Sequence, residues 1–179
     1  MSSFPPHSDG EPFEPQIVGL ACNHCGYASA DSAGGLRRAY PPAISLVRIP
    51  CTGRIEAIHL LKAFEAGADG VVVVGCVEGD CLYSTGNLWA RQCVDHVKEM
   101  LTETGVEPER LEMYNIPGPN GAGFAATVTA FAERIKALGP SPAKRPGAQP
   151  QEDARAALGN IALSDNDPHA VTLEEGHAQ

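Results

Sequence analysis

The sequence predicts an α/β domain in which helices cover a four-stranded parallel sheet. Between residues 16 and 138, short β-branched runs alternate with longer segments of helical periodicity, which is the pattern of strands joined by crossover helices. Residues 71–74 are four consecutive valines, a composition that suits a strand buried on both faces. The chain has 179 residues, enough for one such domain with terminal extensions.

Four strands are expected, at residues 16–21, 44–49, 70–75 and 111–116. Helices are expected over residues 54–66, 87–104 and 124–138, and each is followed by a glycine, the usual residue after a helix end. The first of these helices should carry an apolar stripe formed by Ile55, Ile58, Leu61 and Phe64. Residues 26–39 form the first crossover, although Gly34 and Gly35 weaken it as a helix.

The two ends of the chain differ in composition from the middle. Residues 1–15 are expected to form a flexible N-terminal segment and residues 16–142 the folded domain. Residues 143–179 contain few large apolar side chains and no sustained periodicity, so they are expected to form a disordered tail.

Composition excludes several classes of function. The formal net charge is -9 and no basic stripe is present, so nucleic-acid binding is not expected. The longest apolar run, near residues 70–77, is far shorter than the roughly 20 residues that cross a bilayer. The start lacks the pattern of a signal peptide, which favours a cytoplasmic protein. Six cysteines in such a chain indicate metal binding or redox chemistry rather than a disulfide framework.

Cysteines follow each of the first three predicted strands. Cys22 and Cys25 come after the first strand, Cys51 after the second, and Cys76 and Cys81 after the third. Ligands of open parallel sheets bind at the carboxyl edge, near the point where the strand order reverses. A flavodoxin-like order, with the first strand between the second and third, would gather these three loops. The sequence therefore predicts that five thiols meet at one edge of the sheet.

A single buried cysteine often acts only as a small apolar residue. Five cysteines at three equivalent loop positions favour a functional site instead. Cys93 lies on the apolar stripe of its predicted helix and is expected to fill the core.

Thiolates are the ligands of zinc and of iron-sulfur clusters. Structural zinc usually supports domains too small to fold alone, whereas this chain has enough apolar sequence for its own core, so an iron-sulfur cluster is favoured. Four thiolates hold a 2Fe-2S or a 4Fe-4S cluster, which leaves one of the five spare or redox-active.

Two other interpretations remain open. Cys22-x2-Cys25 beside a strand and helix is also the motif of a thiol-disulfide oxidoreductase, but that motif does not require the three later cysteines. A zinc-stabilised assembly module without electron transfer is the other alternative.

The sequence resembles a known family in three stretches, GLACNHCGYASADSAGGLRRAYPP, RIPCTGRIEAIHLLKAFEAGADGVVVVGCVEGDCLYSTGN and ERIKALGPSP. Together they are similar to the delta subunit of methyl-viologen-reducing hydrogenase, the iron-sulfur protein associated with heterodisulfide reductase. The resemblance covers about residues 16–142 and is carried by the combination CNxC, CTGR and GCxxGDC.

This resemblance implies an electron-carrying subunit that is not itself catalytic. Its cofactor would be a 2Fe-2S cluster, with 4Fe-4S less favoured, in a region formed by Cys22, Cys25, Cys51, Cys76 and Cys81. It would pass electrons between a hydrogenase or formate dehydrogenase module and a flavin-bearing heterodisulfide-reductase-like subunit.

Four charged or polar residues near the cysteines each have more than one interpretation. His24 stands where the family commonly has an aromatic residue, and we expect it to face solvent, with ligation or proton-coupled tuning of the cluster as the alternative. Arg54 fits a surface salt bridge or a cation that raises the cluster potential. Glu78 and Asp80 lie inside the loop from Cys76 to Cys81, where they would lower the potential, border a docking surface or simply be solvated.

Overall fold

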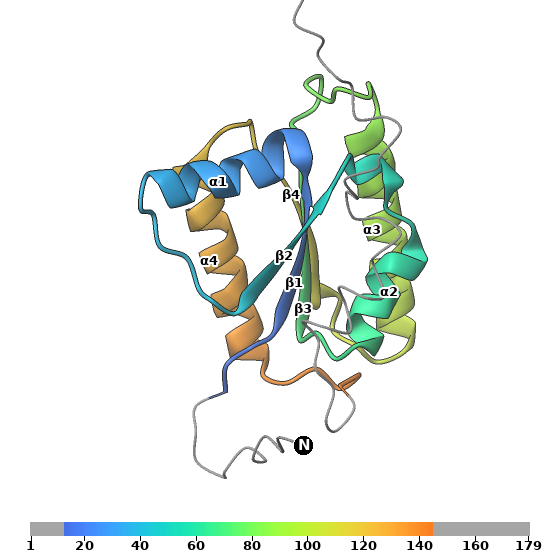
Figure 1. Cartoon of the computed structure of the whole chain (residues 1–179). Coiled ribbons are helices and arrows are strands. Elements are labelled where there is room, and N and C mark those ends of the chain that lie inside the picture. The colour runs from blue at the N-terminus through green and yellow to red at the C-terminus, as the bar shows by residue number, and fades with distance from the viewer. Residues whose placement is uncertain (1–12, 145–179) are drawn as a thin grey trace, which may run out of the picture.

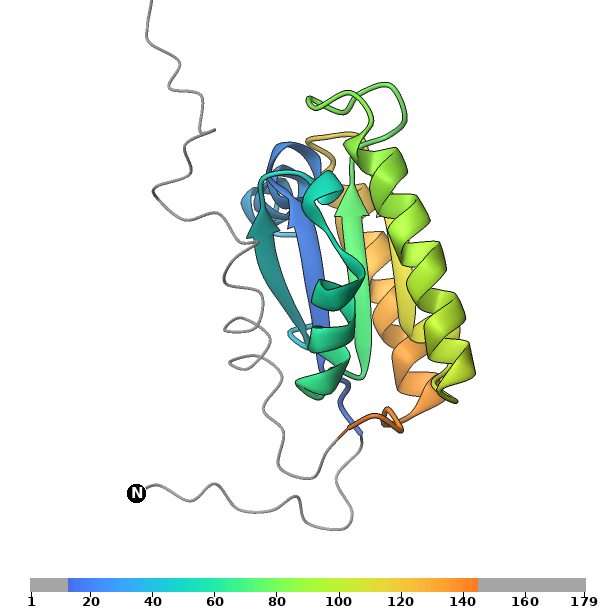
Figure 2. The same ribbon diagram turned by 90° about the vertical axis from the view of Figure 1, so that its right-hand side faces the viewer.

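The computed structural model describes residues 13–144, and its centre is a parallel sheet of four strands. The strands are β1 (Ile17–Cys22), β2 (Ile44–Ile49), β3 (Gly70–Gly75) and β4 (Leu111–Asn115). They lie in the order β2-β1-β3-β4 (Figure 2). The predicted parallel sheet is confirmed, and so is the predicted place of the first strand between the second and the third.

Helices cover both faces of this sheet (Figure 1). α1 (Ala28–Gly35) and α4 (Gly121–Leu138) lie on one face, and α2 (Ala57–Glu65) and α3 (Gly86–Glu103) lie on the other. Three short turns complete the domain: the π-helical η1 (Asn23–Tyr27) and the 3-10 turns η2 (Thr52–Arg54) and η3 (Pro108–Arg110). The flavodoxin-like α/β class is therefore confirmed. None of the helices within residues 13–144 is long and apolar enough to cross a bilayer.

The valine run of β3 packs on both faces, as predicted. Val71 and Val73 belong to the core on the side of α2 and α3, while Val72 and Val74 belong to the core on the side of α1 and α4. All four side chains are fully buried. Burial of a valine side chain stabilises a fold by about 1.5–3 kcal/mol relative to leaving it exposed, so β3 anchors the position of the sheet's carboxyl edge.

The predicted helix over residues 54–66 is wrong at its start. Residues 52–54 form the 3-10 turn η2, and α2 begins only at Ala57, where the backbone N–H of Glu56 donates to Nδ1 of His59 at 3.0 Å. This later start turns a different face inward, so Ile58, predicted to be buried, is 49% exposed. The buried face of α2 consists of His59, Leu60, Ala63 and Phe64.

The edge of the sheet opposite the cysteines is closed by polar contacts. The fully buried Arg110 donates to the carbonyls of Asp69 and Gly139, and the Asp69 carboxylate accepts from the Lys144 ammonium at 3.0 Å. These contacts tie the end of α4 to the sheet and extend two residues past the predicted domain end at 142. The predictions for residues 1–15 and 143–179 lie mostly outside the described residues.

Candidate iron-sulfur centre

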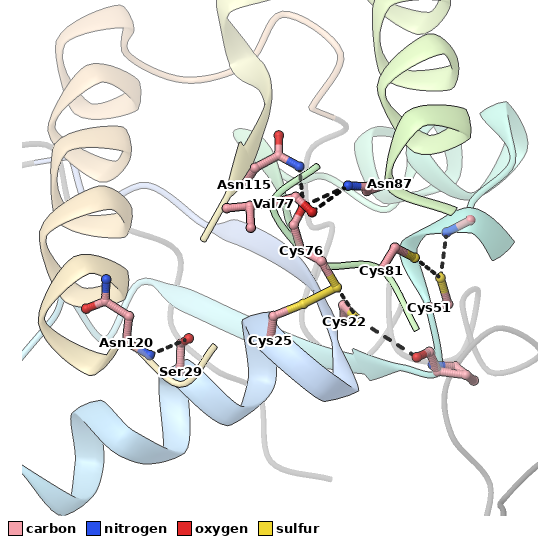
Figure 3. Close-up of a disulfide and its surroundings, with 12 residues drawn as sticks. Cys22, Cys25, Ser29, Cys51, Cys76, Val77, Cys81, Asn87, Asn115 and Asn120 are labelled. Carbon is pink, nitrogen blue, oxygen red and sulfur yellow. Dashed lines mark hydrogen bonds between the residues drawn. A yellow bond between two sulfur atoms is a disulfide. The ribbon is translucent and has the colours of Figure 1, made fainter. Parts of the chain in front are cut away.

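The structure brings the five predicted cysteines into one buried group at the carboxyl edge of the sheet (Figure 3). Cys22 ends β1, Cys25 lies in η1, Cys51 immediately precedes η2, Cys76 follows β3 and Cys81 lies in the loop before α3. All five are buried, although they span 60 positions of the sequence. We call this set the cysteine group.

Strand register explains why these loops meet. Ala21 of β1 pairs with Arg48 of β2 and with Val74 of β3. The three parallel strands therefore end at nearly the same level, and the chain leaves each of them toward the same edge. The predicted convergence of the loops thus follows from the strand order.

Two glycines allow η2 to lie directly on the start of α3. A Cβ at Gly53 would lie 2.6 Å from the Gly86 Cα, and a Cβ at Gly86 would lie 2.5 Å from the Cys51 Sγ. Because both residues lack a side chain, the two backbones can approach closely, and Cys51 lies beside Cys81. The backbone N–H of Gly53 also donates to the Cys51 Sγ at 3.4 Å.

The sulfurs form two subsets. Cys51 and Cys81 are one pair, with 3.9 Å between their Sγ atoms. The Sγ atoms of Cys22, Cys25 and Cys76 all lie within 4.8 Å of one another. In this second subset Cys25 and Cys76 form a disulfide, with 5.5 Å between their Cα atoms, and the Cys22 Sγ lies 3.8 Å from the Cys76 Sγ. A disulfide supplies no thiolate to a metal, so a form that binds metal through these two residues has them reduced.

The two thiols of the first pair differ in acidity. Burial raises the pKa of Cys51 to about 11, although the N–H of Gly53 acts in the opposite direction. Burial also disfavours the Cys81 thiolate, but hydrogen bonds to its sulfur together outweigh burial, and the pKa of Cys81 is lowered. They come from the backbone N–H groups of Tyr83, Asn87 and Gly86 and from the Cys51 side chain. The Cys81 Sγ lies beside Gly86, the first residue of α3, where free N–H groups and the helix dipole favour an anion. Cys81 is therefore the more readily ionised of the pair.

A cavity of about 520 Å³ opens beside this pair and is lined by residues that include Cys51, Arg54, Tyr83 and Trp89. Arg54 is exposed and makes no ion pair within residues 13–144, so the first of its two interpretations, a surface salt bridge, is not seen in this part of the chain. Four large apolar side chains are exposed on the loop before α3 and on its first turn, and we call them the apolar rim: Leu82, Tyr83, Leu88 and Trp89.

The other predicted neighbours lie at the surface. His24 is exposed, as expected, and its ring centroid is 6.2 Å from that of Tyr83. Glu78 and Asp80 are also exposed. Cys93 is half-buried on α3, packs against the core and is not part of the cysteine group, which agrees with its predicted role as a core residue.

Two site residues were missed by sequence reasoning. Asn87, at the start of α3, and Asn115, at the end of β4, both donate their side-chain N–H to the main-chain carbonyl of Cys76. Asn115 ends the fourth strand at the same edge as the cysteines. Its position directly at a strand end is therefore the sequence signal that could have indicated it.

The donor set fits an iron-sulfur cluster. Four thiolates hold such a cluster, and the group supplies five cysteines. The candidate metal ligands that lie together within residues 13–144 are cysteines alone, without a carboxylate or an imidazole. Such a set selects iron-sulfur clusters, zinc or Cu(I) over the metals that prefer oxygen ligands. The fold and the site thus define a class: an α/β protein with an all-cysteine centre at the carboxyl edge of its sheet.

Comparison with known proteins identifies the family within that class. Residues 17–139 match the methyl-viologen-reducing hydrogenase delta subunit family, and the chain belongs to it. It is 47% identical over 130 residues to the iron-sulfur subunit of the F420-non-reducing hydrogenase of Archaeoglobus profundus, covering 73% of this chain and 95% of that protein. The vhu iron-sulfur subunit of the F420-non-reducing hydrogenase of Methanocaldococcus jannaschii is 39% identical over 131 residues, covering 73% of this chain and 98% of that protein. The resemblance seen in the sequence is confirmed.

A second kind of relative is much longer. One subunit of the ferredoxin:CoB-CoM heterodisulfide reductase of Methanosarcina mazei is 39% identical over 126 residues, which is 70% of this chain but 16% of that protein. A domain similar to this chain is therefore part of a larger heterodisulfide reductase polypeptide in that organism.

Proposed function

We propose that this protein is an iron-sulfur electron-transfer subunit. It relays electrons between a hydrogenase or formate-oxidising module and a flavin-bearing heterodisulfide-reductase-like subunit of a larger redox complex. The observation that carries the proposal is the group of five buried cysteines at one edge of the sheet. It is supported by relatives that are named as iron-sulfur subunits of hydrogenases and match this chain over nearly their whole length.

The proposed cofactor is a 2Fe-2S cluster held by four of Cys22, Cys25, Cys51, Cys76 and Cys81. Cys51 and Cys81 form one pair of neighbouring sulfurs, and Cys22 and Cys76 form another at a similar separation. Two pairs suit a cluster of two irons, since each iron takes two cysteine thiolates. When bound, the cluster supplies one-electron redox chemistry, and the protein supplies the ligands, their burial and the backbone N–H groups near the sulfurs.

The proposed docking surface is the apolar rim. Leu82 and Trp89 are each 65% exposed, and exposed apolar side chains that gather in one place mark interaction sites. The rim borders the cavity that reaches Cys51, so a partner seated there would approach the cluster. The proposed occupant is the heterodisulfide-reductase-like subunit, because the Methanosarcina mazei relative carries a similar domain within a heterodisulfide reductase polypeptide itself. The many thiols suit a reducing compartment, and we place the protein in the cytoplasm.

A thiol-disulfide oxidoreductase is the second candidate, and one observation favours it: Cys25 and Cys76 form a disulfide. Both residues are buried, however, with 5% and 3% of their surface exposed. A substrate thiolate must reach a disulfide sulfur in line to exchange with it, and burial obstructs this attack. Electron transfer through a bound cluster needs no such access, so it is the better supported function.

Metal analysis separates these functions. The chain isolated without oxygen is expected to contain about two irons and two acid-labile sulfides, to be brown, and to give a paramagnetic signal on reduction. Stoichiometric zinc without iron would falsify the proposal in favour of the assembly module. A metal-free chain that catalyses disulfide exchange would support the oxidoreductase.

The relay itself is tested by reconstitution. Purified hydrogenase and heterodisulfide-reductase-like subunits should exchange electrons only when the cluster-bearing chain is added. Trp89→Ala should slow this exchange without changing the iron content, whereas Leu36→Ala, which removes a side chain of similar exposure at the end of α1, should not slow it. Equal exchange with and without the chain contradicts the relay, and equal rates in the two variants contradict the docking surface.

A further inference from the structure

The main-chain carbonyl of Cys76 is held by side chains from two other elements (Figure 3). Nδ2 of Asn115, the last residue of β4, donates to this oxygen at 2.5 Å. Nδ2 of Asn87, in the first turn of α3, donates to it at 3.1 Å and to the carbonyl of Val77 at 3.0 Å. The peptide that follows Cys76 is therefore clamped from both sides by amides.

Both asparagines are themselves held in a fixed orientation. Oδ1 of Asn115 accepts from Nη2 of Arg91 at 2.8 Å, and the same nitrogen donates to the carbonyl of Met113 at 2.9 Å. Oδ1 of Asn87 accepts from the backbone N–H of Leu88 at 3.1 Å. Since each amide oxygen is engaged elsewhere, each amide nitrogen points toward Cys76. This arrangement orients the donors before any cluster is bound.

The two asparagines bind the Cys76 carbonyl just beyond the point where the hydrogen-bonded pairing of β3 and β4 ends. The last register pair of β3 and β4 joins Gly75 to Asn115, and the N–H of Ile116 donates to the carbonyl of Gly75. The carbonyl of Cys76 has no further strand partner, so its direction depends on the two amides. Among residues 13–144, none of the other four cysteines of the group has a side-chain amide on its own carbonyl.

We propose that Asn87 and Asn115 are positioning residues for the cluster, a role that rests on the proposed function. By fixing the Cys76 carbonyl they fix the backbone from which the thiolate projects, and so keep the Cys76 Sγ 3.8 Å from the Cys22 Sγ. They also place the positive ends of two amide dipoles, one of them linked to the Arg91 guanidinium, beside a ligand of the cluster. Such outer contacts raise the reduction potential and slow the loss of metal.

Two substitutions test this role. Asn115→Asp keeps an acceptor for Arg91 but presents an oxygen, instead of a donor, to the Cys76 carbonyl. Asn87→Asp keeps the acceptor for the N–H of Leu88 and loses both donated bonds. Each is expected to weaken iron retention about 10- to 100-fold, lower the reduction potential and change the paramagnetic signal of the reduced cluster. Asn115→Gln, which retains a donor, should restore part of the retention.

Asn120→Ala is the matched control. Among residues 13–144, the Asn120 side chain caps α4 by accepting from the N–H of Gly123 at 2.8 Å and makes no hydrogen bond to the cysteine group. This variant should lower the thermal stability of the cluster-free chain without changing the potential or the signal. If Asn115→Asp or Asn87→Asp folds and matches the wild type in potential, signal and iron retention, the positioning role is wrong. A wild-type chain without iron and sulfide contradicts the proposed function instead, which keeps the two failures distinct.

Discussion

Substitution of Gly86 by alanine should disturb the site by adding a single methyl group. The new Cβ would lie 2.5 Å from the Cys51 Sγ and 3.3 Å from the Cys81 Sγ. Carbon atoms in contact prefer about 3.5–4.0 Å and sulfur needs slightly more, so the Cys51 sulfur must move by roughly 1 Å or more. Overpacking of this kind costs about 1–3 kcal/mol. Because Cys51 is one of the proposed cluster ligands, its displacement should also lower the iron content of the chain.

Gly34→Ala is the matched control, because a Cβ at Gly34 meets nothing within 4 Å. Both glycines are helical, so the gain of about 0.5–1 kcal/mol from replacing glycine by alanine is common to both variants. Urea unfolding of the reduced, cluster-free chains should therefore separate the two by about 1–3 kcal/mol. Iron and sulfide analysis of the anaerobically isolated chains supplies the second readout. Equal stability and equal iron in the two variants would refute the close approach of Gly86 to Cys51.

Three further outcomes follow from the same geometry. Cys93→Ser should retain the cluster, whereas Cys51→Ser should lose or distort it, and equal iron loss in both would contradict the separation of Cys93 from the cysteine group. A chain shortened to residues 13–144 should fold and bind iron, because all the strands and helices of the domain lie within it. An insoluble, iron-free product would show that the domain needs residues outside this range. Mild oxidation of the cluster-free chain with a small disulfide should join Cys25 to Cys76, with the reagent reduced to thiol, and peptide mapping that finds another pair would contradict this assignment.

The fold was predictable from the sequence where local pattern and tertiary structure agree. The valines of β3 indicated a strand buried on both faces, and cysteines placed directly after three strands indicated the functional edge. The start of α2 was not predictable, because the turn at residues 52–54 depends on the contact of Gly53 with Gly86, two residues 33 positions apart in the sequence. The apolar periodicity of residues 54–66 contains no information about such a contact. It therefore predicts an inward-facing Ile58, which the structure does not have.

The grouping of the five cysteines was predictable from the sequence, and the side chains that hold their backbone were not. Because cysteine is a rare residue, its repeated position directly after strands indicated a functional site. Asparagine is common in turns and at helix starts, so Asn87 and Asn115 gave no signal until the structure placed both on one carbonyl. The division of the sulfurs into two subsets also depends on side-chain directions that spacing does not determine.

The acidity of the thiols leads to a last prediction, on alkylation of the reduced, cluster-free chain. The thiolate is the reactive form, and the pKa of Cys81 lies below its usual 9.0 while that of Cys51 is raised to about 11. As the pH rises, the rate at which iodoacetamide labels Cys81 should therefore reach half its maximum below pH 9.0, whereas the rate for Cys51 should reach half its maximum near pH 11. Both residues are buried, so burial slows their labelling at every pH, and the pH at which each rate reaches half its maximum reports ionisation. Mass spectrometry of the labelled peptides gives both rates, with Cys93, whose pKa burial also raises, as a reference outside the site. A labelling midpoint at lower pH for Cys51 than for Cys81 would contradict the view that the N–H groups at the start of α3 stabilise the Cys81 thiolate.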